Sequence, residues 1–159
     1  MSVRCICTPE SFRPAPTTGV RWLAPQADYY RYEQMLLTRG VAPPSYETWL
    51  EWHALGYGFA AFVRAGTVLS VGTVLRQPEG DWQLAGVRTL DGHTGQGHAT
   101  AVSSFLTAYI LAERGRAACA VPEDSPAMRR IVERLGYVVA SLQICAKRDT
   151  DTLPLDYFS

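Results

Sequence analysis

The residue types and spacing that best fit a ligand-binding role in this sequence occur in a glycine-rich stretch, residues 90–100. Its glycines, Gly92, Gly95 and Gly97, lie between an apolar strand-like run, 82–90, and an amphipathic helix-like run, 99–114. Glycines at such a junction let unpaired backbone N–H groups and the positive end of a helix dipole face an anion. The stretch therefore predicts a phosphate-binding loop, and a flexible connection that binds nothing is the alternative.

Length and composition limit the function classes that this chain can serve. Its 159 residues fit one domain, 1–159, and 47% apolar with 19% charged residues is typical of a folded globular protein. The formal net charge is zero and Lys147 is the only lysine, so the chain lacks the basic footprint that a nucleic acid or an acidic membrane attracts. With no long apolar run and no secretory signal, we expect a cytoplasmic protein without nucleic-acid or membrane partners.

The four cysteines do not form a metal-binding pattern. Cys5 and Cys7 would share one face of a strand, and neither they nor Cys119 and Cys145 stand in a Cys-x-x-Cys pair or beside a histidine cluster. We expect buried, reduced thiols and no metal.

The hydrophobic pattern predicts an α/β (α+β) chain with a mixed sheet. Strands at 59–63, 67–76 and 82–90 would form an antiparallel meander, and 117–121 would follow the loop helix as a parallel partner of 82–90. We also expect helices that begin near Asp28, Ser45 and Pro126, the last of them ending at Gly136. The remaining expected strands are 20–23, 137–146 and two edge strands, at 1–7 and 153–158.

Two motifs carry a resemblance to a known family. The first is Thr94-Gly95-Gln96-Gly97-His98-Ala99, after the strand at 82–90, and the second is the helix from Ser125 that ends in Leu135-Gly136-Tyr137. In this order the chain resembles the GNAT superfamily of acyl-CoA-dependent N-acyltransferases, whose pyrophosphate loop has the pattern Arg/Gln-x-x-Gly-x-Gly/Ala.

The resemblance implies a GNAT-like, mostly antiparallel sheet of six to seven strands with about four helices. The parallel strands 82–90 and 116–121 would splay apart, and the pantetheine arm of acetyl-CoA, or of another acyl-CoA, would lie between them against the main chain of Thr89 and Leu90. The implied pyrophosphate site consists of the loop and the first turn of the next helix, namely Thr94, Gly95, Gln96, Gly97, His98, Ala99 and Thr100.

The sequence departs from the family pattern at positions that matter for chemistry. The usual Arg or Gln at the start of the loop is Thr94, and the frequent Asn before the last helix is Ser125, either a cofactor contact or simply a helix cap. The Tyr that often protonates the departing thiolate aligns with Val132, which has no proton to give. Catalytic residues therefore stay unassigned, with Asp91 and His93 as candidates for the base. The alternative for Asp91 is a turn residue, and for His93 a solvated loop residue.

The first two helices would form the acceptor site by resemblance. Their aromatic residues predict one of three roles: an apolar or aromatic acceptor pocket, a hydrophobic core, or the contact face of a homodimer. The aromatic residues concerned are Tyr29, Tyr30, Tyr32, Tyr46, Trp49, Trp52 and Tyr57, with His53 among them. The expected function is acyl transfer from acyl-CoA to the amine of a small molecule. The alternatives are a catalytically degenerate module that binds CoA or another phosphorylated ligand, or the same fold with another acyl donor or a decarboxylation.

Overall fold

The computed structural model describes residues 1–143, and over that range the chain forms four α-helices and one seven-stranded sheet. The strand order is β2-β3-β4-β5-β6-β1-β7, and every neighbouring pair is antiparallel except β5 and β6. In chain order the elements are β1 (Ser2–Cys7), β2 (Val20–Trp22), α1 (Tyr29–Thr38), α2 (Tyr46–Ala54), β3 (Tyr57–Arg64), β4 (Thr67–Leu75), β5 (Trp82–Thr89), α3 (His98–Arg114), β6 (Ala117–Pro122), α4 (Pro126–Arg134) and β7 (Val138–Gln143). The predicted mixed, mostly antiparallel sheet with about four helices is confirmed.

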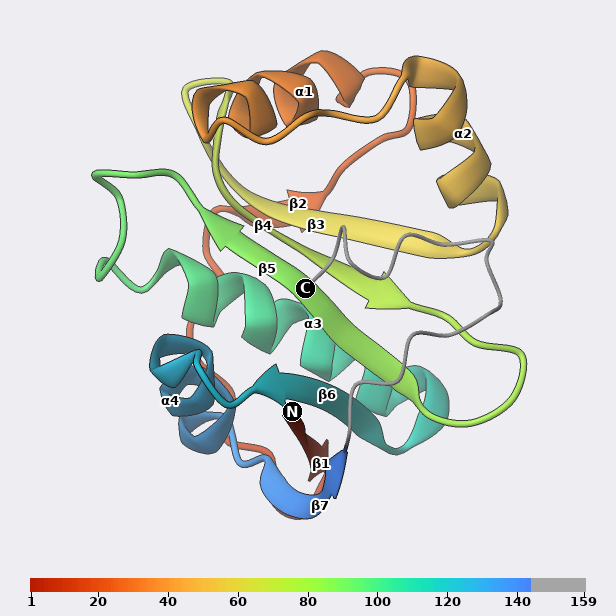
Figure 1. Cartoon of the computed structure of the whole chain (residues 1–159), viewed down its shortest axis with the longest axis vertical. Helices are drawn as coiled ribbons and strands as arrows, with labels where there is room; N and C mark the ends of the chain where they lie inside the picture. Colours follow the sequence, from red (N-terminus) through yellow and green to blue (C-terminus); the bar gives the residue numbers. More distant parts are fainter. Residues whose placement is uncertain (144–159) are drawn as a thin grey trace.

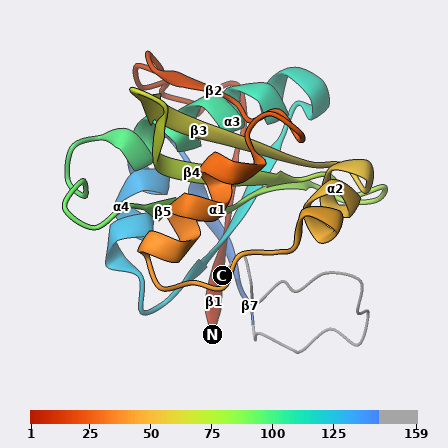
Figure 2. The same cartoon turned by 90° about the horizontal axis from the view of Figure 1, so that it is seen from above.

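Helices cover both faces of the sheet, so the fold has three layers (Figures 1 and 2). On one face α1 and α2 bury Tyr32, Leu36 and Trp49 against β3 and β4. On the other face α3 and α4 bury Leu106 and Val132 against the sheet. The two core clusters follow from the alternation of side chains along each strand, which sends neighbouring residues to opposite faces.

Local sequence signals set the element ends. The Ser45 hydroxyl accepts a hydrogen bond from the Thr48 N–H at 3.1 Å and so caps α2, as its residue type predicts. Pro126 opens α4, and Gly115 closes α3 in the left-handed conformation. The predicted meander is present as β3, β4 and β5.

The N-terminal strand is the main correction to the predicted arrangement. Residues 1–7 were expected at a sheet edge, but β1 lies inside the sheet, where it pairs with β6 from Ser2↔Pro122 to Cys7↔Ala117. On its other side β1 pairs with β7, from Ser2↔Gln143 to Ile6↔Val138. The near-continuous burial of β1 is typical of a strand covered on both faces. Its sequence carried no sign of its partners because they lie more than a hundred residues away.

The parallel strands β5 and β6 pair only at their starts. The register joins Trp82 to Ala117 and Gln83 to Ala118, and no further pair follows. A shift in the β4–β5 register leaves Gly86 and Val87 opposite the single residue Gly72. Such a bulge bends a strand and increases its twist, which directs the end of β5 away from β6. The predicted splay of the two strands is therefore present.

Other expectations concern the cysteines, the C-terminal strands, membrane-spanning helices and metal sites. Cys5, Cys7 and Cys119 are buried free thiols, as expected, whereas Cys145 lies outside the described residues. The strand expected at 137–146 is described as far as Gln143, and the one expected at 153–158 lies beyond. Within residues 1–143, no helix is long and apolar enough to cross a membrane, and no cluster of metal-binding side chains occurs.

Candidate functional site

The loop between β5 and α3 presents unpaired backbone donors. Gly92, Gly95 and Gly97 have φ values of +84°, +76° and +86°, which side chains with a Cβ rarely adopt. Gly97 is the N-cap of α3, and no side chain caps this helix end. The first intrahelical bond runs from the Ala101 N–H to the Gly97 carbonyl, so the N–H groups of His98, Ala99 and Thr100 have no acceptor within the helix.

A pocket of about 470 Å³ lies against this loop. It is lined by the loop, the first turn of α3, the end of β5 and one side of α4, which all lie on the left side of the molecule in Figure 1. Its lining residues are Thr89, His93, Thr94, Gly95, Gly97, His98, Ala99, Thr100, Ala127, Arg130, Ile131 and Arg134. We call this the loop pocket.

The loop pocket is cationic although the whole chain is neutral. Arg130 and Arg134 line it, and no Asp or Glu of residues 1–143 does. Neither arginine has an ion pair with any residue in the described range, whereas Arg129, on the same helix, pairs with Glu133 at 2.7 Å. Two arginines beside unpaired main-chain donors favour a phosphorylated anion.

The pocket opens toward the splayed strands. Thr89 lines it at the end of β5. The N–H of the next residue, Leu90, donates to the carbonyl of Leu69 at 2.9 Å and so belongs to the β4 side. Because successive residues of a strand direct their main-chain groups to opposite edges, those of Thr89 face the gap beside β6. An extended ligand arm can pair there as an added strand would.

The structure brings most of the predicted cofactor residues together. Seven of them line the loop pocket: Thr89, Thr94, Gly95, Gly97, His98, Ala99 and Thr100. Gln96 lines a neighbouring hollow, and Leu90 is buried with its N–H already bonded to β4. Ser125 is the N-cap residue of α4, but its side chain makes no capping hydrogen bond and lines neither hollow.

The candidate proton-transfer groups differ in whether they line the loop pocket. Asp91 is exposed and does not line the loop pocket, whereas His93 does, with its Nδ1 buried and without a hydrogen-bond partner among the described residues. Val132 is fully buried in the core. Tyr137 is also buried; its hydroxyl lies 2.7 Å from that of Thr107, and burial raises its pKa well above the usual value. Neither residue can reach a ligand in the pocket.

The aromatic residues of α1 and α2 mostly form core. Tyr32, Trp49 and Trp52 are each at most 4% exposed and pack on the sheet with Phe59, while Tyr30 and Tyr46 remain exposed. His53 packs edge-on against Trp49, and burial, followed by the nearby Arg76, lowers its pKa to about 4. Of the three roles that the sequence left open, the structure shows the core for these buried rings.

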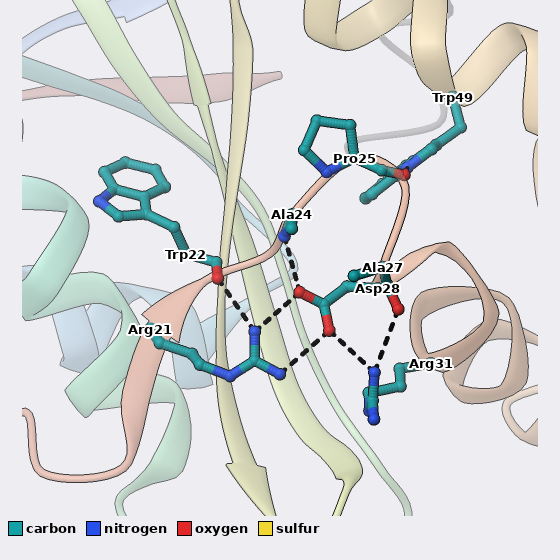
Figure 3. Close-up of polar contacts among 8 residues, drawn as sticks. All are labelled: Arg21, Trp22, Ala24, Pro25, Ala27, Asp28, Arg31 and Trp49. Atoms are coloured by element: carbon teal, nitrogen blue, oxygen red, sulfur yellow. Dashed lines mark hydrogen bonds and ion pairs between the residues drawn. The ribbon is translucent and has the colours of Figure 1, made fainter.

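The carboxylate of Asp28 belongs to a structural hydrogen-bond network. Its carboxylate is buried and accepts hydrogen bonds from Arg21, Arg31 and the N–H of Ala24 (Figure 3). Hydrogen bonding from Arg21 holds its pKa below the usual value. A carboxylate engaged in this way is unsuited to act as a base.

Sequence reasoning missed the two arginines of α4. Ala127, Arg130, Ile131 and Arg134 are spaced by three, four and seven residues, which places them along one side of the helix. The prediction for this helix used only its apolar positions, which overlap this side of the helix at Ile131. These positions are Met128, Ile131, Val132 and Leu135. Both sides exist in the structure: Val132 and Leu135 enter the core, and the arginines border the pocket.

No protein-family model matches the sequence, and no curated protein does. Among solved structures, the chain is similar to an acetyltransferase from the GNAT family of Colwellia psychrerythraea, with a TM-score of 0.71 and 14% identity over 87% of this chain and 52% of that one. It is also similar to the ribosomal-protein-alanine N-acetyltransferase of Brucella melitensis biovar Abortus 2308, with a TM-score of 0.64 and 16% identity over 81% of this chain and 96% of that one. A Trypanosoma brucei acetyltransferase matches with a TM-score of 0.64 and 19% identity, over 81% and 98% of the two chains.

These comparisons identify the fold. The chain has the fold of the GNAT superfamily, as the two motifs predicted. It spans about half of the Colwellia protein, with 52% coverage, and nearly all of the other two.

Proposed function

We propose that this chain is an acyl-CoA-dependent N-acyltransferase that transfers an acyl group, with acetyl as the first candidate, to the amine of a small molecule. The observation that carries the proposal is the loop pocket, where main-chain donors of the first turn of α3 and two arginines without an ion pair among the described residues meet at the gap between β5 and β6. Phosphates at the loop and an acyl-bearing arm along Thr89 would use both ends of this site.

The chemistry needs little from the side chains. An acyl-CoA supplies a thioester whose carbonyl carbon is open to attack by a neutral amine; the C–N bond forms, and the C–S bond breaks with release of a thiolate. The chain's own part is to hold the thioester in place and to offer main-chain N–H groups of the splayed β5 to the carbonyl oxygen as charge develops there. His93 is the pocket side chain that we propose accepts the proton of the amine.

A second function is favoured by one specific observation. Among residues 1–143 no tyrosine lines the loop pocket; Val132, which aligns with the family's acid position, is in the core, and so is the nearby Tyr137. A module that binds CoA without transferring the acyl group would have this arrangement. Both proposed functions include CoA binding, and only the acyltransferase transfers the acyl group to an amine.

Binding and turnover are tested separately. Isothermal titration with acetyl-CoA and CoA tests the ligand, and absence of binding at millimolar concentration overturns both functions. Release of free thiol from acetyl-CoA across a panel of small amines, with acylated amine as the second product, supports the enzyme. Binding without thiol release supports the module. The His93→Gln variant should bind acetyl-CoA normally and release free thiol more slowly than the unmodified chain.

A further inference from the structure

The side chain of His98 anchors the loop between β5 and α3. Residues 94–97 are exposed, and a Cβ at Gly95 or Gly97 would meet no atom within 4 Å, so little packing holds this part of the loop. His98, the first residue of α3, is only 6% exposed. The loop therefore passes from the surface into the packed part of the protein at this residue.

The His98 ring stacks on Phe62 of β3. The two ring centroids are 4.0 Å apart, and the ring planes differ by 24°. Phe62 is itself held in place, because it pairs with Val20 and Ser70 in the sheet. The backbone of Gly19 also approaches closely, since a Cβ there would lie 2.8 Å from the Phe62 ring. The stack thus joins the start of α3 to the sheet.

A hydrogen bond extends this anchor into the loop. The His98 Nε2 lies 3.0 Å from the Gln96 Oε1, and because an amide oxygen only accepts, the Nε2–H is the donor. The bond spans Gly97, the N-cap of α3, and so restrains the backbone on both sides of it. Backbone N–H groups of this segment are the donors proposed to hold the phosphates, so His98 positions them.

Cationic groups surround His98, and no carboxylate balances them. Arg130 and Arg134 of α4 line the loop pocket together with His98. His93 acts on it from the loop, and Arg64 from the end of β3, where the guanidinium lies 5.3 Å from the centroid of the ring on which His98 stacks. His98 also lines the neighbouring hollow of about 350 Å³, and among residues 1–143 no Asp or Glu lines either cavity. The β1–β2 connection adds an uncharged wall to this hollow, which consists of Ala15, Pro16 and Thr18.

This environment disfavours a charge on His98 in the free protein. Burial, followed by Arg64 and His93, lowers the pKa of His98 below its usual value, so the ring is mostly neutral at pH 7. A phosphate bound at the loop would supply the missing counter-charge and favour the imidazolium. The bond to Gln96 survives this change, because the Nε2–H remains a donor when a proton from solvent adds to Nδ1.

We propose that His98 is a positioning residue of the phosphate-binding loop and that it takes up a proton from solvent when the diphosphate of an acyl-CoA binds. This inference rests on the proposed function, because that diphosphate belongs to the same ligand. The liganded chain then binds more protons than the free chain. Affinity therefore rises as the pH falls through the interval between the pKa of His98 in the liganded chain and its lower pKa in the free chain.

Calorimetry with dephospho-CoA tests the proton uptake. The diphosphate of this probe stays fully ionised between pH 5.5 and pH 8, whereas CoA also carries a phosphate monoester that titrates near about pH 6. We expect binding at pH 5.5 to be about fivefold tighter than at pH 8, and the heat of binding to depend on the ionisation enthalpy of the buffer. In His98→Phe, which keeps a ring against Phe62, the two affinities should agree within about twofold.

Proton NMR assigns the proton uptake to a residue. The chain has three histidines, and His53→Phe, His93→Gln and His98→Phe each remove one set of imidazole signals. The pKa of His98 should rise when dephospho-CoA binds to the unmodified chain. If it does not rise, or if His98→Phe keeps the full pH dependence of binding, the proton uptake is wrong and the proposed function still stands.

The Gln96→Ala variant tests the positioning role. Gln96 is exposed, so its replacement leaves the core intact, and Gln34→Ala, on the exposed side of α1, is the matched control. We expect Gln96→Ala to bind dephospho-CoA about threefold or more weakly at both pH values, and the control to bind normally. Combined with His98→Phe, it should add no further loss at pH 8, because both changes break the same bond.

Two outcomes separate this role from the proposed function. Normal binding by Gln96→Ala, or losses that add in the double variant, overturn the positioning role alone. Failure of the unmodified chain to bind both dephospho-CoA and acetyl-CoA overturns this inference and the proposed function together.

Discussion

The carboxylate of Asp28 accepts hydrogen bonds from both terminal nitrogens of Arg21, at 2.7 and 3.0 Å. The pair links β2 to the start of α1, and the same carboxylate accepts from the Ala24 N–H at 2.6 Å (Figure 3). Asp28 is 2% exposed, so its charge depends on these donors. The arrangement fixes the helix that covers β4 and thus one face of the sheet.

Replacing this carboxylate tests its structural role. We expect Asp28→Asn to lower the free energy of unfolding by about 2–3 kcal/mol, because two arginines and a backbone N–H lose a charged acceptor. Urea denaturation measures the change. Arg129→Gln, which breaks the exposed pair with Glu133, is the control and should cost less than about 1 kcal/mol. Equal stability of the two variants would contradict the buried network.

Acid should destabilise the fold through His53. Burial lowers the pKa of His53 to about 4, from 6.5 in the unfolded chain, so the unfolded state binds more protons between these values. This contribution to stability is therefore fully present above pH 6.5 and is lost as the pH drops from 6.5 toward 4. The lowered pKa of Asp28 acts in the same direction at still lower pH.

The His53→Phe variant isolates this effect. Phenylalanine keeps an aromatic ring against Trp49 and Phe59 but cannot take up a proton. Chemical denaturation at pH 7 and pH 4.5 should show a smaller loss for the variant than for the unmodified chain. An identical loss in both would mean that other groups carry the acid sensitivity.

The loop glycines offer a matched pair of substitutions. Gly97 and Gly92 have nearly the same φ, +86° and +84°, and a Cβ at either would meet no atom within 4 Å. Alanine at each position should therefore cost a similar 1–2 kcal/mol of backbone strain, a rough value for the left-handed region. Gly97 lines the loop pocket and Gly92 does not.

Affinity should therefore separate the two variants. We expect Gly97→Ala to weaken acetyl-CoA binding at least about tenfold, because the first N–H groups of α3 shift, while Gly92→Ala binds normally. Calorimetry measures the affinity, and thermal unfolding checks that the two variants lose similar stability. Similar affinity losses in both would place the anion elsewhere in the loop.

The position of Tyr137 predicts a stability effect without a catalytic one. Tyr137→Phe leaves the fully buried Thr107 hydroxyl without its partner at 2.7 Å, which should cost about 1–2 kcal/mol. Turnover and its pH profile should not change, because the ring lies in the core. The double variant with Thr107→Val should recover part of the lost stability, and a drop in kcat at normal stability would give Tyr137 a catalytic role instead.

Much of the site's framework could be predicted from the sequence because its signals are local. The glycines, the cap at Ser45 and the proline that opens α4 act within a few residues. The helices α2 and α4 begin where these signals predict, and α3 begins one residue before the predicted Ala99. The aromatic residues of α1 and α2 were ambiguous, because helical spacing is the same for a core stripe and for a pocket wall. In the structure Tyr32, Trp49 and Trp52 are buried, so these residues belong to the core.

The sequence by itself determined the loop and the helix start behind it, since positive φ at Gly95 and Gly97 is a property of these residues and their immediate neighbours. Only the tertiary structure decided what faces that loop. Arg130 and Arg134 border the pocket because α4 packs its apolar side, with Val132, into the core and so leaves the opposite side toward the loop. Residues 15–18 reach the site because β1 pairs between β6 and β7, a contact between distant parts of the chain that no local pattern encodes.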